Sequence, residues 1–318
     1  SVRGLAIGAT SFEDHFLLAI GGSAAIDSNA VGLALSVSVG VIQGRTRATL
    51  GAGATVNADN TGANSGQGAL LRASDETNVE TVVGGLAISG STGIGGAVSV
   101  AIVSNEAHAE ALGGNAITTA SGGVTLDAKS KTDIDAVAIA VAGTVSTQSG
   151  SGGGGSAAGL SSSATGSGGT GAGASGSGPG NGGGQSSNNS ISFAGAGSAA
   201  GNTVDNSVRA TIGAGSTVTT DGDVALSATD SSAITADAGG VAIAIDTSGN
   251  DPLAVGVSVG INFVTLGIEA SIDDSTVTAG GAVSVGAASA ASIDVLTVAG
   301  AASVGTGGSG NGGTTAFG

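Results

Sequence analysis

The chain has 318 residues and a mass of 28.8 kDa, and its 63 glycines show how strongly small residues dominate it. It contains no cysteine, which excludes disulfide frameworks, zinc–thiolate centres, iron–sulfur clusters and cysteine nucleophiles. Seven Lys and Arg against 23 Asp and Glu give a net charge of −16, which argues against nucleic acid and anionic membranes as partners. A mean hydropathy of +0.39 argues against a disordered acidic chain.

The ends and the apolar runs of the sequence indicate where the protein works. It begins at Ser1 without a signal peptide, so we expect a mature product or a fragment of a longer protein. The absence of cysteine and the scarcity of lysine are usual for bacterial exoproteins and predict an extracellular or cell-surface location. The longest apolar stretch, Val31 to Ile42, is too short to span a bilayer, so no membrane insertion is expected.

A repeat of about 60 residues runs along the chain. Val56, Ile117, Val218 and Val277 occupy equivalent places and lie 61, 101 and 59 residues apart. The middle spacing equals one period plus an insertion of roughly 41 residues, which is visible as a tract of Gly, Ser, Ala and Thr.

This periodicity divides the chain into four parts. In chain order they are repeats over 1–145, a Gly/Ser-rich low-complexity insertion over 146–190, further repeats over 191–305, and a Gly-rich tail or the start of a next insertion over 306–318.

Within each repeat the pattern has a period of two, as where Val98, Val100 and Ile102 alternate with small residues. Such alternation is typical of half-buried strands, and the sequence therefore predicts an all-β fold. Equivalent anchors at Val98, Ile117 and Ile134 suggest that each repeat contains about three coils of a parallel β-solenoid, or β-helix. Stacking such short coils would give a rod on the order of 65 Å long.

The third unit of each repeat is apolar on both faces of the expected strand. A strand buried on one side should be polar on the other, so the outward stripe needs a cover. Either it forms a lateral interface between rods, or the Gly-rich tract or a second layer of the same chain covers it. The interface candidates are Val137, Ile139, Val141, Val241, Ile243, Ile245, Leu296 and Val298.

Two histidines lie beside carboxylates, but neither predicts a catalytic site. His15 follows Glu13 and Asp14 in a segment that we interpret as a loop. His108 lies between Glu106 and Glu110 on an alternating strand, so all three should share one face, which we interpret as a solvated polar face rather than a metal site. We therefore predict no enzyme activity, no catalytic residue and no bound cofactor.

Calcium is the metal that the sequence favours most. Asp221, Asp223, Asp273 and Asp274 lie at expected turns, where carboxylates stacked along a solenoid edge could collect Ca²⁺. The glycine-rich nonapeptide of calcium β-rolls is absent from the sequence, and the alternative is that these are ordinary turn residues.

Several tandem segments carry a resemblance to a known class of proteins. They are Gly-Ala-Val-Ser-Val at 96–100, Ser-Thr-Val-Thr-Thr-Asp-Gly-Asp-Val-Ala-Leu-Ser-Ala at 216–228, and Ser-Thr-Val-Thr-Ala-Gly-Gly-Ala-Val-Ser-Val at 275–285. These resemble the repeats of giant secreted bacterial adhesins of the filamentous-haemagglutinin type and related exoproteins. The resemblance covers most of the chain outside the Gly-rich tract and implies a secreted β-solenoid stalk or fibre.

The expected function is therefore structural: a stiff repeat segment of an extracellular surface adhesin or self-assembling filament. The expected partners are further copies of the protein and a host or matrix glycan, with lateral or end-to-end association. One alternative is a glycan- or ice-binding module, because Thr217, Thr219, Thr276 and Thr278 suggest outward threonine rows that Ala54 and Thr118 interrupt. A third is a carbohydrate-active β-helix enzyme, which would need clustered carboxylates in a pocket.

Overall fold

The computed structural model describes residues 4–27, 30–57, 64–147, 192–248, 251–306 and 314–318. In this part of the chain every regular element is a strand, and all strand pairs are parallel. The chain winds through three sheets in the same order on every turn, and equivalent strands stack on one another. The predicted all-β parallel solenoid is confirmed.

The two large sheets and one small sheet form the sides of the solenoid. Sheet A contains β1 (Gly4–Ala25), β4 (Gly68–Ser89), β7 (Val124–Ser146), β10 (Val224–Asp246), β13 (Val283–Ser289) and β14 (Ser292–Gly305). Sheet B contains β2 (Val31–Leu50), β5 (Thr92–Ala111), β8 (Phe193–Ile212), β11 (Leu253–Ile272) and β15 (Thr315–Phe317). Sheet C contains β3 (Thr55–Val56), β6 (Ala116–Thr119), β9 (Thr217–Thr220) and β12 (Thr276–Ala279).

One repeat makes one coil, so the expectation of about three coils per repeat is wrong. The anchors Val98, Ile117 and Ile134 lie on β5, β6 and β7, which are three sides of the same coil. Residues one full period apart are the ones that stack, as Ile117 does on Val56 and on Val218. Alternation reports only that a residue faces in or out, and it does not report where one strand ends and the next coil begins.

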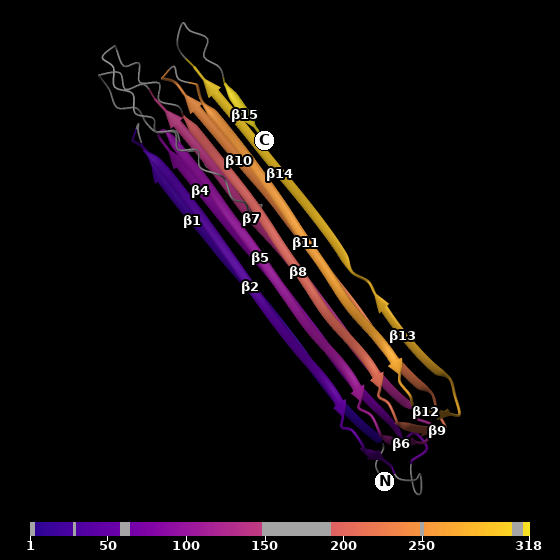
Figure 1. Cartoon of the computed structure of the whole chain (residues 1–318). Helices are drawn as coiled ribbons and strands as arrows, with labels where there is room; N and C mark the ends of the chain where they lie inside the picture. The colour runs from indigo at the N-terminus through magenta and orange to yellow at the C-terminus, as the bar shows by residue number, and fades with distance from the viewer. Residues whose placement is uncertain (1–3, 28–29, 58–63, 148–191, 249–250, 307–313) are drawn as a thin grey trace.

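Long strands give the molecule an unusual shape. The complete strands of the two large sheets have 20 to 23 residues, which corresponds to roughly 70 Å, whereas five stacked strands rise only about 20 Å. The long dimension therefore runs along the strands, as Figure 1 shows, and not along the solenoid axis as expected for a rod of short coils. The result is a flat, two-sheet blade.

The strands before and after the Gly-rich tract belong to one stack. Although the predicted insertion at 146–190 separates β7 from β8 in sequence, β8 pairs in register with β5 of the preceding coil. Residues 148–190 of that insertion, residue 191 at the start of the next predicted repeat region, and residues 307–313 of the predicted tail lie outside the described residues. The insertion enters at the corner where the other coils pass from sheet A to sheet B, so it leaves the stack uninterrupted.

The core becomes thinner from one end of the strands to the other. Near sheet C the buried cluster contains large side chains such as Leu71, Leu126 and Ile212. The middle cluster is built on Val79, Val103 and Ile134 together with alanines, and the buried cluster at the far end consists of alanines. Sheet C holds the two large sheets apart at one end, and the sheets approach each other at the other end.

We call the far end, where the A strands finish and the B strands begin, the thin end. Inward-facing glycines allow the sheets to meet there. A Cβ on Gly85 would lie 2.3 Å from the carbonyl oxygen of Gly96, and one on Gly95 would lie 2.4 Å from that of Val141. Glycine is required at such positions because two backbones come into contact. The described residues contain no helix that could cross a membrane.

This geometry predicts opposite effects for two glycines at the thin end. Gly95→Ala forces a Cβ into the facing backbone and should lower the free energy of unfolding by about 1–3 kcal/mol. Gly143 faces outward, and a Cβ added there would have no atom within 4 Å, so Gly143→Ala should be neutral or stabilising by up to about 1 kcal/mol. Urea midpoints followed by circular dichroism give the comparison, and equal losses in both variants would contradict the close approach of the sheets.

Candidate functional site

The outer surfaces of sheets A and B are divided into an apolar and a charged half. Outward side chains are charged near sheet C and apolar at the thin end, on both faces of the blade. Because strands of sheets A and B run in opposite directions, the final halves of the A strands lie beside the first halves of the B strands (Figure 1). The two apolar faces therefore occupy the same end of the molecule.

All eight predicted interface residues lie on the outer face of sheet A at the thin end. Val137, Ile139 and Val141 on β7 stand beside the outward residues of β10 and, through them, those of β14. Val241, Leu296 and Val298 are 40%, 57% and 53% exposed. No described residue covers this face, and the alternative cover, the Gly-rich tract, lies outside the described residues, so the interface assignment stays a prediction. The structure adds Leu18 and Ile20 of β1 and Val82, Leu86 and Ile88 of β4, which the sequence analysis missed.

The outer face of sheet B is a second apolar surface that the sequence analysis did not identify. Every outward residue of β2 from Val31 to Val41 is Val or Leu, and these side chains are between 54% and 63% exposed. The signal was the apolar run from Val31 to Ile42, which was weighed only as a membrane span. The inward residues of this run, such as Ala34 and Ser36, are small and fill the narrow interior. The larger apolar residues of the run are therefore the outward ones.

The charged half of sheet B contains an ion-pair ladder that crosses the strands. Arg47 Nη2 lies 2.5 Å from Glu106 Oε2, and Arg209 Nη2 lies 2.5 Å from Glu269 Oε2. The Arg47 hydrogen bond lowers the pKa of Glu106, and the Arg209 hydrogen bond lowers that of Glu269. These pairs are partly exposed, so each contributes at most about 1 kcal/mol to stability.

His108 shares its face with Glu106 and Glu110, as predicted. Its Nδ1 lies 3.5 Å from Glu110 Oε1 and its Nε2 lies 3.2 Å from Ser207 Oγ. Burial lowers the pKa of His108, which favours the neutral imidazole. Arg45 Nε lies 3.5 Å from Glu106 Oε1 and Arg47 Nη2 lies 2.5 Å from Glu106 Oε2, so arginines engage both oxygens of that carboxylate.

The interpretation of the His15 segment as a loop is wrong. Residues 11–16 lie inside β1, where Glu13 and His15 face inward and Asp14 faces outward. His15 Nε2 lies 3.2 Å from Glu13 Oε2, and His15 stacks beside Val79, its equivalent in the next coil. Glu13 and His15 are accommodated because no described strand lies below β1 on its other side.

The calcium candidates lie in two separate turns. Asp221 and Asp223 lie between β9 and β10, where Asp223 Oδ1 accepts a hydrogen bond from the Ala282 amide at 2.7 Å. Asp273 and Asp274 lie between β11 and β12, and Asp273 Oδ2 accepts a bond from Ser271 at 3.2 Å. Within the described ranges, no three His, Cys, Asp or Glu residues are grouped as metal ligands. Calcium binding is therefore supported by the sequence pattern alone.

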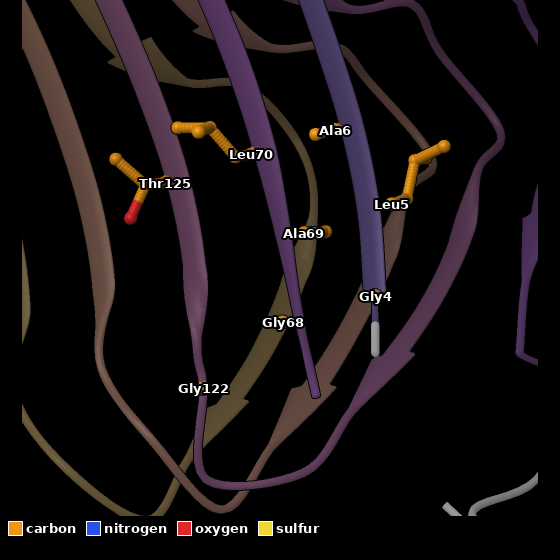
Figure 2. Close-up of a pocket in the computed structure, with 8 residues that line it drawn as sticks. All are labelled: Gly4, Leu5, Ala6, Gly68, Ala69, Leu70, Gly122 and Thr125. Carbon is orange, nitrogen blue, oxygen red and sulfur yellow. The ribbon is translucent and has the colours of Figure 1, made fainter. Parts of the chain in front are cut away.

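A shallow hollow of about 410 Å³ lies where β1, β4 and β7 begin. Figure 2 shows its lining, in which Thr125 carries the one side-chain hydroxyl among glycine, alanine and leucine residues. Such a lining offers no charge and no acid–base group. The lining residues are Gly4, Leu5, Ala6, Gly68, Ala69, Leu70, Gly122 and Thr125.

A buried polar layer crosses the core between the large apolar clusters. Asn105 Nδ2 donates to Thr77 Oγ1 at 2.9 Å, and its Oδ1 accepts from the Gly44 amide at 3.1 Å. Asn206, the residue paired with Asn105 in the next coil, donates to hydroxyls and a carboxylate of β7 and β10. These bonds join sheet B to sheet A at one position along the strands, and they therefore fix the alignment of the two sheets.

Comparison of the chain with models of protein families, with curated proteins and with solved structures found no match.

The polar layer predicts that replacing a buried asparagine lowers stability more than replacing an exposed one. Asn206→Ala leaves buried hydrogen-bonding groups without their donor and should lower the free energy of unfolding by about 1–3 kcal/mol. Asn78 lies on the exposed face of β4, where its Nδ2 donates to Asp14 Oδ1 at 3.3 Å. Asn78→Ala should therefore change the free energy of unfolding by no more than about 0.5 kcal/mol. Equal midpoints for the two variants in urea unfolding would show that the layer contributes nothing specific.

Asp75 predicts a pH dependence of stability. Burial raises its pKa above 3.8, against hydrogen bonds from Thr46 and Thr77 that lower it, and Glu13 raises it further. A raised pKa in the folded state means that stability present below pH 3.8 is lost as pH rises through the folded pKa. Asp75→Asn should therefore raise the urea midpoint at pH 7 and have little effect at pH 3. A variant that destabilises equally at both pH values would contradict this assignment.

Proposed function

We propose that this chain is a structural repeat segment of an extracellular bacterial surface adhesin or self-assembling filament. The observation that carries the proposal is the in-register stacking of equivalent strands on all three sides of the solenoid. Such stacking gives a continuous ladder of backbone hydrogen bonds, which resists bending and can be extended one coil at a time. The adhesin assignment and the extracellular location rest on the resemblance of the repeat motifs and on the composition.

The core at the last coil supports extension of the stack. Val283, Val285, Ile293 and Val295 face inward, yet they are between 42% and 52% exposed because no further described strand lies above them. An edge strand with free backbone groups and exposed core residues pairs readily with another strand. We propose that a further coil, from the same protein or from a second molecule, stacks on this edge.

The opposite edge of the stack, formed by β1, combines apolar and ionisable residues in its inward row. Leu5, Ile7 and Leu17 of β1 are partly exposed core residues, whereas Glu13 and His15 place ionisable groups in the same inward row. Inward-pointing charges discourage indiscriminate pairing of an edge strand. The two edges are therefore unequal, which favours a directed, head-to-tail order of stacking over random association.

Electron microscopy tests the structural role. Negative-stain images of the native material, with mass by light scattering on the same sample, should show filaments or elongated particles that exceed one chain in length. The open edges are the reason for this expectation. Isolated particles of single-chain mass at every concentration would contradict self-assembly. Protease treatment of intact source cells should remove the protein if it is extracellular, and complete protection would contradict that location.

One observation favours a second candidate, a glycan- or ice-binding surface on sheet C. Thr276 and Thr278 of β12 stack on Thr217 and Thr219 of β9, and Thr118 continues the second column. Thr118 therefore does not interrupt its row, whereas Ala116 interrupts the other column. Thermal hysteresis or binding to a glycan array by the wild type, lost in Thr219→Lys, would support this candidate.

A further inference from the structure

We propose that the outer face of sheet B at the thin end packs against the same face of a second copy of this chain. This inference deepens the proposed function, on which it rests, by naming the face and the partner of lateral association. The face comprises the first halves of β2, β5, β8 and β11, from Leu33 to Val41 and their equivalents on the other strands. We call it the B patch.

The B patch is large and contains no charged residue. The outward positions of its four strands are Val, Leu, Ile, Phe, Gly, Ala and one Thr. Four strands over nine residues cover on the order of 600 Å². That value is at the upper end for apolar patches on monomeric proteins, and it approaches the roughly 800 Å² that each partner contributes to a standard interface.

The side chains of the B patch form unequal rows. On β5 the outward residues Val98, Val100 and Ile102 form a row of branched side chains, whereas their neighbours on β8 are Ala199, Gly201 and Thr203. A Cβ on Gly201 would have no atom nearer than 4.0 Å, so the chain's own packing does not require glycine there. Glycine at an open position in a strand is typical of close approach by another chain.

A two-fold axis parallel to the strands makes the two rows complementary. With the axis between β5 and β8, the branched row of β5 in one copy stands over the low row of β8 in the other, and the reverse contact forms at the same time. The same rotation places β2 of one copy over β11 of the other. The strands of the two facing sheets then run in the same direction, which is compatible with aligned sheet packing.

Charges beyond the B patch fit the same rotation. Arg45 and Arg47 of β2 would lie over the part of β11 that contains Glu269, so cations of one copy meet an anion of the other. The charged half of sheet B is nearly balanced, with Arg45, Arg47 and Arg209 against Asp205, Glu106, Glu110 and Glu269. Contact through this face therefore brings little net charge together, although the whole chain has a net charge of −16.

The outer face of sheet A fits a second copy less well. Its outward cations are Arg72, Lys129 and Lys131, and its outward acids are Asp14, Glu76, Glu80, Asp127, Asp133, Asp135, Asp237 and Asp294. Asp237 lies within the apolar half itself, beside Val137. Two copies meeting through this face would repel each other, and an uncharged patch on sheet B avoids that cost.

A lipid bilayer is the other apolar partner, and the structure disfavours it. The edge strands of sheet B are β2 and, beyond Val255, β11, and both present backbone N–H and C=O groups without a described neighbouring strand. Unpaired backbone groups of an open sheet cost several kcal/mol each in hydrocarbon. A second copy covers the B patch without placing either edge in an apolar medium.

Analytical ultracentrifugation of the chain tests the inference directly. The wild type should self-associate between about 1 and 100 µM, with a laterally paired dimer among the species, and Val98→Lys should raise the dissociation constant of that dimer at least tenfold by placing a charge in the contact. Ile139→Lys places the same charge on the rival apolar face of sheet A, and it should leave the dimer unchanged if the B patch is the contact. A dimer lost in Ile139→Lys and kept in Val98→Lys would overturn the choice of face. Circular dichroism and urea midpoints verify that both variants fold.

Cross-linking tests the two-fold arrangement, because the chain contains no native cysteine. Val98→Cys mixed with Ala199→Cys should form mixed dimers with a short bis-maleimide faster than either variant alone. Homodimers of Val98→Cys forming fastest would overturn the proposed orientation.

A wild type that is monomeric throughout, or a chain that floats with phosphatidylcholine vesicles, would overturn the second copy as partner. An unchanged dissociation constant in Val98→Lys, together with filaments of the wild type under the electron microscope, would overturn the sheet B contact and leave the proposed function intact.

Discussion

The register of parallel strands from one coil to the next is the constraint on which the whole molecule depends. Each residue stacks on its equivalent one repeat away, so a slip of one residue would turn every buried side chain outward. The buried asparagines Asn105 and Asn206 reinforce this register, since their hydrogen bonds to sheet A can form at one alignment of the two sheets. Backbone pairing and side-chain pairing therefore specify the same arrangement.

Much of the fold could be predicted from alternation and repetition. The equivalence of Val56, Ile117, Val218 and Val277 predicted correctly which residues stack. The length of the strands could not be predicted. Glycine pairs such as 84–85 and 95–96 lie within strands, and the narrow interior requires glycine at the inward members, Gly85 and Gly95. Other glycine pairs, such as 122–123, lie in turns.

Of the two apolar outer faces, the sequence indicated the one on sheet A and not the one on sheet B. The residues of sheet A at the thin end were recognised because Ala136 and Ala138 alternate with larger apolar residues. The face of sheet B escaped notice because its inward partners are Gly, Ala and Ser, which look like a polar or neutral face in a sequence. In most half-buried strands the larger apolar residues face the core. Where this core becomes thin, the small residues face inward and the larger apolar residues face outward.

The corner at the thin end, where the chain passes from sheet A to sheet B, tolerates insertions. The passage from sheet A to sheet B takes two residues between Ser89 and Thr92, yet it takes 46 residues between Ser146 and Phe193, and the coils on both sides keep their pairing. This corner therefore accepts connections as different as two and 46 residues without altering the stack. A lineage could lengthen, diversify or exchange the inserted peptide coil by coil, and an engineer could place an epitope between Asp246 and Leu253 on the same principle.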